Sequence, residues 1–172
     1  MPVLTIGHGT RPLEQLVETL IHAGAETLID VRRFPGSRRN PQFNQATIAA
    51  ALAAAGIGYR HAVELGGRRS AEPGEDRFAC IRVAAFRSYA ARMRRAEWQE
   101  ALTAALAEPE PCFMCAETLW TRCHRRLIAD LLTARGHRVI HLIAPKRSEP
   151  HELWGEAEAR DGKLYLCGEL VA

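Results

Sequence analysis

Thiol, imidazole, carboxylate and guanidinium groups are concentrated in the short segment from Cys115 to Arg125. It contains two thiols, Cys115 and Cys123, with Glu117 and His124 close to them in sequence. A thiol beside the first turn of a helix faces unpaired backbone N–H groups and the positive end of the helix dipole, and nearby arginine adds positive charge. Because these effects lower the pKa of a thiol, the segment predicts a nucleophilic thiolate at Cys115 or Cys123. We expect His124 to be its acid–base partner, with Glu117 as a further proton carrier.

The same segment is also compatible with a purely structural role. His124 falls on one face of a predicted helix with Leu127, Ile128, Leu131 and Leu132. A histidine on that face fits a packed, hydrogen-bonded position beneath a sheet, and cysteine is a common small core residue. The residues of the segment leave the reactive and the structural roles open.

A metal site is an alternative to thiol chemistry. Cys112 and Cys115 have C-x-x-C spacing. Residues three apart on a regular strand point to opposite faces, so these two thiols are not expected to meet at one metal. Without Cys112, a mixed sulfur, nitrogen and oxygen set remains that suits zinc or iron, namely Cys115, Glu117, Cys123 and His124.

A second group of polar residues follows two other predicted strands. Asp30 and Arg32 are two residues apart, so we expect them on the same side of the chain. Asp30 is either a catalytic carboxylate or the anchor of an ion pair. Arg33, Arg38 and Arg39 are candidates to clamp an anionic ligand through bidentate hydrogen bonds, and Arg32, Arg38 and Arg125 are the residues predicted to bind it. His8, which directly follows the first strand, is a further candidate catalytic residue.

The hydrophobic pattern predicts the elements that must hold these groups. Apolar runs bounded by polar or glycine residues predict strands, and apolar residues at helical spacing predict helices between them. Strands are expected at 4–7, 27–31, 57–63, 112–115 and 137–143, with a short edge strand at 164–167, and helices at 13–23, 45–55, 78–95, 98–106 and 122–134. This alternation predicts a three-layer α/β fold, with a mostly parallel sheet of about five strands and helices on both faces.

Several of the candidate residues come directly after a strand. His8 follows the first strand, Asp30 ends the second, and Cys115 ends the fourth. Ligands of open parallel sheets bind beyond the carboxyl ends of the strands. We therefore expect these side chains to meet in one site at that edge.

Length and composition limit the classes of protein that this chain can be. Its 172 residues, 47 % hydrophobic and 25 % charged, predict one domain over 1–172 and exclude a disordered or fibrous chain. No apolar run is long enough for a membrane span, and the N-terminus does not resemble a signal peptide, so we expect a cytoplasmic protein. The five cysteines are an odd number, and in the cytoplasm we expect free thiols rather than a disulfide framework.

Motifs along most of the chain resemble those of a bacterial and archaeal family known as domain of unknown function 488. They are Thr5-Ile6-Gly7-His8, Leu28-Ile29-Asp30-Val31-Arg32, Pro35-x-Ser37-Arg38, Pro41-Gln42-Phe43-Asn44, Glu64-Leu65-Gly66-Gly67, Tyr89-Ala90, and Cys115-x-Glu117 with Cys123-His124-Arg125. The resemblance implies a small cytoplasmic α/β protein, without a settled reaction. It also implies that His8, Asp30, Arg32, Cys115, Glu117, Cys123, His124 and Arg125 act as one set.

These observations give one leading functional hypothesis and two alternatives. The leading hypothesis is an enzyme-like site at the carboxyl edge of the sheet that binds a small anionic or phosphate-bearing ligand. The first alternative is the metal-binding module described above. The second is a nucleic-acid-binding protein that uses the arginine-bearing loops at 32–39 and 60–69, although the net charge of +3 and the 6 % aromatic content do not favour it.

Overall fold

A six-stranded sheet forms the centre of the computed structural model, which describes residues 2–67 and 70–172. The strand order is β3-β2-β4-β1-β5-β6, and each strand is parallel to its neighbours except β6, which pairs antiparallel with β5. The strands are β1 (Val3–Gly7), β2 (Thr27–Asp30), β3 (Gly58–His61), β4 (Pro111–Cys115), β5 (Val139–Ala144) and β6 (Arg147–Pro150). The predicted mostly parallel α/β architecture is therefore confirmed.

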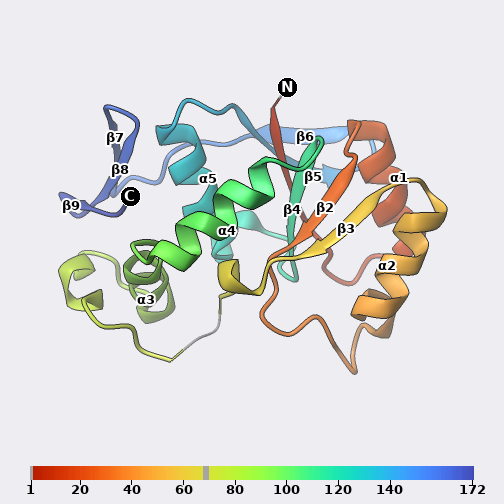
Figure 1. The fold of residues 1–172 in the computed structure, drawn as a ribbon, viewed down its shortest axis with the longest axis horizontal. Coiled ribbons are helices and arrows are strands. Elements are labelled where there is room, and N and C mark those ends of the chain that lie inside the picture. The colour runs from red at the N-terminus through yellow and green to blue at the C-terminus, as the bar shows by residue number, and fades with distance from the viewer. Residues whose placement is uncertain (1, 68–69) are drawn as a thin grey trace.

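Helices cover both faces of this sheet (Figure 1). The helices α1 (Leu13–Ala23) and α2 (Gln45–Ala54) lie on one side, and α3 (Ala84–Met93), α4 (Ala96–Leu106) and α5 (Arg125–Ala134) lie on the other. Two separate cores result because successive strand residues point to opposite faces. Cys112 belongs to the core beneath α1 and α2, whereas Cys115 belongs to the core beneath α3, α4 and α5, as expected for residues three apart on a strand.

The chain reverses its direction of travel across the sheet at β4 and β1. From β1 it moves outward through α1 to β2 and through α2 to β3, and it then returns to place β4 between β2 and β1. From β4 it crosses in the opposite direction, through α5, to β5. Such a switch point is the usual ligand position in open parallel sheets.

Several boundaries differ from those that the hydrophobic pattern predicts. The helix expected at 78–95 is shorter, because a 3-10 turn (η3, Glu75–Phe78) and an extended Val83 precede α3. The helix expected at 122–134 begins only at Arg125, because Cys123 is extended after a 3-10 turn (η4, Trp120–Arg122). The central sheet has six strands rather than five, because β6 is a polar, exposed edge strand with no apolar signature.

The C-terminal segment forms a second, three-stranded antiparallel sheet instead of an edge strand of the first. It consists of β7 (Ala157–Arg160), β8 (Lys163–Leu166) and β9 (Glu169–Leu170). The buried side chains of Leu164, Leu166 and Val171 join the core on the α5 side, so this small sheet packs beside α5 (Figure 1).

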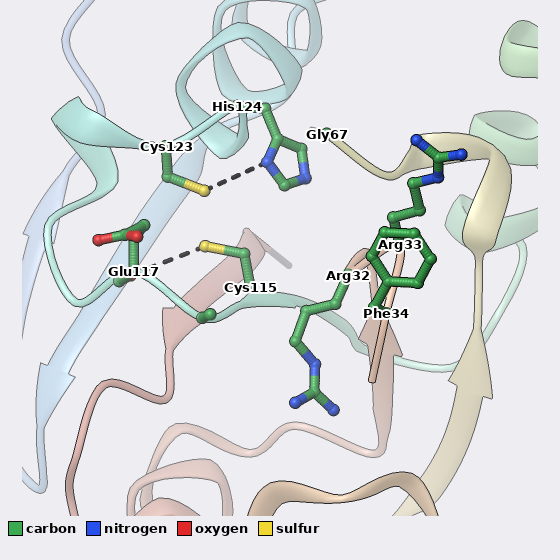
Figure 2. A pocket seen from close by; sticks show the side chains of 9 residues that line it. Arg32, Arg33, Phe34, Gly67, Cys115, Glu117, Cys123 and His124 are labelled. Atoms are coloured by element: carbon green, nitrogen blue, oxygen red, sulfur yellow. Dashed lines mark hydrogen bonds between the residues drawn. The ribbon is translucent and has the colours of Figure 1, made fainter. Parts of the chain in front are cut away.

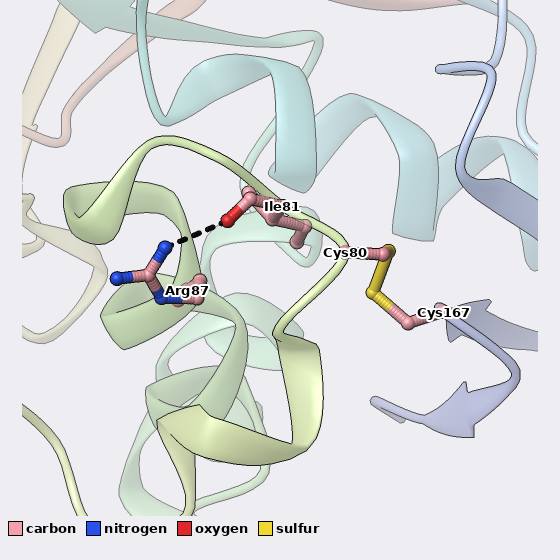
Figure 3. The surroundings of a disulfide bond; sticks show 4 residues. All are labelled: Cys80, Ile81, Arg87 and Cys167. Atoms are coloured by element: carbon pink, nitrogen blue, oxygen red, sulfur yellow. Dashed lines mark hydrogen bonds between the residues drawn. A yellow bond between two sulfur atoms is a disulfide. The ribbon is translucent and has the colours of Figure 1, made fainter.

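A disulfide between Cys80 and Cys167 corrects the expectation of free thiols throughout. It joins residues 87 apart, with 5.7 Å between their Cα atoms, and links the turn before α3 to the C-terminal sheet (Figure 3). Next to it, Arg87 donates a hydrogen bond to the Ile81 carbonyl at 2.8 Å. Cys112, Cys115 and Cys123 remain free. The odd number of cysteines reflects one disulfide plus three thiols.

No helix in the described residues is long and apolar enough to cross a membrane.

Candidate functional site

The carboxyl ends of three neighbouring strands supply the polar residues of the site. His8 follows β1, Asp30 ends β2, and Cys115 ends β4, which lies between the other two strands. The start of α5 and the two residues before it bring Arg125, His124 and Cys123 to the same edge. The predicted convergence at this edge follows from the sheet order, because β4 is hydrogen-bonded to both β1 and β2.

Arg125 is almost fully buried and contacts groups from three segments. Its Nε donates to the Sγ of Cys115 at 2.9 Å, its Nη1 donates to the hydroxyl of Thr5 at 3.2 Å, and its Nη2 donates to the Glu117 carbonyl at 2.6 Å. None of these partners is a carboxylate. We had expected Arg125 to bind a ligand directly, but its guanidinium is directed at the thiols and the backbone.

The backbone of β1 leaves room for the Arg125 contacts. A Cβ atom at Gly7 would lie 1.9 Å from the Glu117 carbonyl oxygen and 2.8 Å from Nη2 of Arg125. Any side chain at residue 7 would therefore push the Glu117 backbone away from the guanidinium. The glycine of the Thr5–His8 motif is explained by this close approach.

The two thiols of the site ionise very differently. Burial raises the pKa of Cys115 well above its usual value, and its interaction with the Cys123 thiol raises the pKa further. Burial also opposes ionisation of Cys123, but the Cys115 hydrogen bond, the charge of Arg125 and the Arg125 backbone N–H outweigh it and lower the pKa of Cys123 to about 7. Cys123 is therefore the more readily ionised of the two thiols.

His124 is oriented so that it can exchange a proton with Cys123. Its Nε2 lies 3.1 Å from the Val31 carbonyl oxygen, which only accepts, so Nε2 carries the hydrogen. Its Nδ1 therefore directs a lone pair toward the Sγ of Cys123 at 3.4 Å (Figure 2). A Cβ atom at Gly67 would lie 2.8 Å from this Nδ1, so the glycine lets the loop pack directly against the imidazole.

Asp30, Arg32 and His8 form a separate cluster beside the thiols. Asp30 accepts two hydrogen bonds from the Arg32 side chain, at 2.8 and 2.6 Å, and a third from the Tyr59 hydroxyl at 2.7 Å. Arg32 Nη1 donates to the Phe43 carbonyl at 2.9 Å and lies 3.3 Å from Nε2 of His8. The predicted same-side placement of Asp30 and Arg32 takes the form of a buried ion pair.

His8 is held neutral within this cluster. Burial lowers its pKa to about 4, and its Nδ1 donates to the Gly9 carbonyl at 2.8 Å, which leaves Nε2 to accept from Arg32. Its ring also stacks on Phe43 with 4.3 Å between centroids. Both nitrogens are thus engaged, and His8 lies beside the ion pair rather than against a thiol.

Three pockets lie at this edge of the sheet, and Cys123 borders two of them. A small pocket of about 110 Å³ is bordered by both thiols, His124 and Gly67, with Arg33 and Phe34 at its rim (Figure 2). A larger pocket of about 460 Å³ shares Arg32, Phe34 and Glu117 with the first and adds polar groups from the 36–40 loop. A third of about 490 Å³ lies on the other side of Cys123 and His124 and is lined by aromatic and aliphatic side chains, chiefly Val83, Phe86, Tyr89 and Trp154.

Two predicted ligand-contacting residues have different surroundings from those expected. Arg38 is exposed and does not border these pockets, whereas its neighbours Ser37 and Arg39 line the larger one. Glu117 is exposed at the rim of all three pockets, and its backbone carbonyl rather than its carboxylate contacts Arg125 and Cys115. Thr5 and Gly67 were named only as parts of sequence motifs, and no role in the site was predicted for either, because Thr5 lies within an apolar strand and Gly67 within a loop.

The metal-binding and nucleic-acid-binding alternatives gain no support from the described residues. Within 2–67 and 70–172, no group of three or more histidine, cysteine or acidic residues is arranged to hold a metal ion. Of the arginines in the 60–69 loop, Arg60 is paired with Glu108 at 2.8 Å, and Arg68 and Arg69 lie outside the described residues.

Comparison with known proteins gives one match. A family model described as "Domain of unknown function DUF488" matches residues 12–132, which is well over half of the chain. No curated protein and no solved structure matches the chain significantly. The match ends before β5, so it includes the Cys115–Arg125 segment and both partners of the Asp30–Arg32 ion pair.

Proposed function

We propose that this chain, which belongs to the DUF488 family, is a thiol-dependent enzyme whose nucleophile is Cys123 and whose substrate is a small anionic molecule. One observation carries the proposal. The Cys123 thiol has a pKa of about 7 and borders an open pocket, with an imidazole nitrogen 3.4 Å away. A thiolate available at neutral pH beside an acid–base group is the usual arrangement for covalent catalysis by cysteine.

The covalent step that this geometry favours is a displacement. His124 takes the thiol proton on Nδ1, and the Cys123 sulfur then forms a bond to an electrophilic atom of the substrate. The bond from that atom to the leaving group breaks, and the leaving group keeps the electron pair and accepts the proton from His124. Water then attacks the same atom and gives a proton to His124, and the bond to sulfur breaks to return the thiolate.

The surrounding pockets support an anionic substrate. The small pocket has room for a reacting group only, whereas the adjoining larger pocket carries Arg39, Ser37 and the edge of the Arg32 guanidinium. Four of the five N–H groups of Arg32 are used by Asp30, Phe43 and His8, so Arg39 and Ser37 are the better candidates to hold a carboxylate or phosphate. The aromatic pocket on the other side of Cys123 suits an apolar part of the same substrate.

Alkylation of the free thiols across pH tests the proposal. We expect iodoacetamide to modify a single cysteine, identified by mass spectrometry as Cys123, with a rate that reaches half its maximum near pH 7. Cys123→Ser should abolish this modification. Cys112→Ala is the matched control, because that thiol is buried on the opposite face of the sheet and its removal should leave the rate unchanged. A midpoint near the ordinary thiol value of about 8.5 would contradict the proposal.

Anionic selectivity is tested with the same reaction. The ratio of the alkylation rate with iodoacetate to that with iodoacetamide should be higher for Cys123 than for a free thiol in solution. Inorganic phosphate should lower both rates. Arg39→Gln should remove the advantage of iodoacetate and the protection by phosphate without moving the midpoint, because Arg39 lines the larger pocket and does not contact the thiol. Equal behaviour of the two reagents would remove the anionic substrate from the proposal and leave the thiol chemistry in place.

A further inference from the structure

A chain of buried hydrogen bonds leads away from the thiol site, along the face of the sheet that α5 covers, and back to α5. Arg125 Nη1 donates to the Thr5 hydroxyl at 3.2 Å, and this hydroxyl lies 2.6 Å from Nδ1 of His141. Nε2 of His141 lies 3.0 Å from Nδ1 of His151, and Nε2 of His151 lies 2.9 Å from a carboxylate oxygen of Asp130. The chain thus begins in the first turn of α5 and ends in its second turn.

Every side chain in this path is buried, although none had been identified as functional together. Thr5 and Asp130 are fully buried, Arg125 and His141 are 1 % exposed, and the side chain of His151 is fully buried. Thr5 and His141 are direct partners in the β1–β5 ladder, which places them on the same face of the sheet. Burying so many polar groups is costly, and the hydrogen bonds along the path offset part of that cost, although Oδ2 of Asp130 is buried without a hydrogen-bond partner among the described residues.

The charged groups at the two ends fix the direction of the hydrogen bonds that they themselves make. Arg125 can only donate, so the Thr5 oxygen accepts from it, and the Thr5 hydrogen stays available for a donation to His141 Nδ1. At the other end an ionised Asp130 can only accept, so His151 donates from Nε2. With His151 neutral, its Nδ1 accepts from His141 Nε2, and both rings then carry the hydrogen on Nε2. All donors point from the arginine to the carboxylate.

We propose that Thr5, His141, His151 and Asp130 form a positioning relay that holds the Arg125 guanidinium against the thiols of Cys115 and Cys123. The relay gives Arg125 a distant anionic counterpart in place of an adjacent carboxylate. An adjacent carboxylate would neutralise the guanidinium, whereas the relay orients it and leaves its charge available to the sulfur atoms. Its functional consequence rests on the proposed role of Cys123, but the proton positions within it do not.

Other side chains contact the relay at His141 and Asp130. The Trp120 ring stacks on His141 with 4.2 Å between centroids and covers the imidazole pair. Asp130 also accepts from the Trp154 backbone N–H at 3.1 Å and is close enough to Arg126 to interact with its charge. Burial, the neighbouring His151 and the charge of Arg125 lower the pKa of His141 to about 3, which agrees with a neutral imidazole in the relay.

The proton positions are measured on the whole protein by ¹⁵N NMR of the histidine rings at pH 7, with His141→Gln and His151→Gln used for assignment. We expect both rings to be neutral with the hydrogen on Nε2. A hydrogen on Nδ1 of either ring would overturn the relay as drawn. This measurement does not depend on the reactivity of Cys123.

The effect on the thiols is measured by iodoacetamide alkylation of Cys123 at pH 6. Thr5→Val removes the hydroxyl link, and we expect the rate to fall roughly 3–10-fold, as for an increase in the pKa of Cys123 of up to one unit. Thr5→Ser keeps the hydroxyl and should restore the rate. Thr19→Val is the matched control, because Thr19 is also buried but its hydroxyl donates to the Gln15 carbonyl within α1, away from the thiol site.

The outcomes separate the two proposals. Thr5→Val and Thr19→Val variants that both react like the unmodified protein, with the low Cys123 midpoint intact, would overturn the relay and leave the thiol chemistry standing. If Thr5→Val does not fold, Asp130→Asn, which keeps the shape of the carboxylate, takes its place with the same expected fall. A Cys123 midpoint near that of a free thiol, with both hydrogens on Nε2, would overturn the enzyme proposal while the relay keeps its proton order.

Discussion

The Nε of Arg125 lies 2.9 Å from the Sγ of Cys115, and this buried cation has only oxygen atoms of uncharged groups and thiol sulfurs as its partners in the described residues. A buried guanidinium without a carboxylate is costly, and that cost falls when a nearby sulfur is ionised. The same interaction therefore favours the Cys123 thiolate and stabilises the charge of Arg125, whose pKa is raised by the two thiols despite burial.

Replacing Arg125 by lysine should separate charge from geometry. A lysine keeps the positive charge but loses the planar fork that reaches Cys115, Thr5 and the Glu117 carbonyl together. We expect Arg125→Lys to slow Cys123 alkylation at pH 6 by about 10-fold, which corresponds to an increase of one unit in the pKa. The neighbouring Arg126→Lys is the control, since that guanidinium stacks on Trp154. Equal rates in the two variants would show that the fork is not needed.

Adding a methyl group at Gly67 should disturb His124 without touching a thiol. The new Cβ would lie 2.8 Å from Nδ1 and 3.1 Å from Cγ of the imidazole, so the ring must move away from Cys123. We expect Gly67→Ala to slow alkylation several-fold at pH 7 and to lower the free energy of unfolding by about 1–3 kcal/mol, as for other overpacked positions. Gly155→Ala, where nothing lies within 4 Å, should change neither quantity. Unaltered alkylation in Gly67→Ala would exclude His124 as the proton acceptor.

The parts of the fold that local patterns encode were predictable, and the rest depend on tertiary pairing. Apolar runs such as the one in β1 identify buried parallel strands, because both of their faces are covered. The position of β4 between β2 and β1 has no local signature. The edge strand β6 is polar and exposed, so its sequence does not differ from that of a loop. The Cys80–Cys167 disulfide joins segments whose proximity only the folded chain creates.

The residues of the site likewise include some that were predictable from the sequence and others that were not. Residues directly after strand ends, such as Asp30 and Cys115, were predictable because their position follows from strand boundaries. Thr5 and Asp130 were not, because each lies inside an element whose neighbours are apolar and buried. His141 becomes informative only when the β1–β5 register places it opposite Thr5.

Two buried histidines should make the protein sensitive to mild acid. Burial is the main cause that lowers the pKa of His8 to about 4 and that of His141 to about 3, from about 6.5 in an unfolded chain. The unfolded state therefore takes up these protons first, so stability is complete above about pH 6.5 and falls as the pH drops toward 4. Each histidine contributes a loss on the order of 3 kcal/mol over that range. Urea unfolding between pH 7 and pH 4 measures this slope.

A His8 variant tests how much of the loss of stability at low pH comes from His8. His8→Gln keeps a polar side chain near Arg32 and the Gly9 carbonyl but does not titrate, so we expect a shallower fall in stability below pH 6.5. The exposed His22 on α1 is the control position, and His22→Gln should leave the slope unchanged. A slope that is identical in the two variants would mean that His8 is not responsible.

The Cys80–Cys167 disulfide should stabilise the fold without serving the thiol site. It closes a long loop, with the two cysteines 87 residues apart, and cross-links that restrict the unfolded chain contribute about 2–4 kcal/mol. We expect the Cys80→Ala/Cys167→Ala double variant, or reduction with dithiothreitol, to lower the urea midpoint accordingly, and reduction of the double variant to have no further effect. Neither cysteine borders the pockets around Cys123, so the pH midpoint for Cys123 alkylation should stay near 7. A midpoint that moves with reduction would show instead that the C-terminal sheet and the thiol site are coupled through α5, against which that sheet packs.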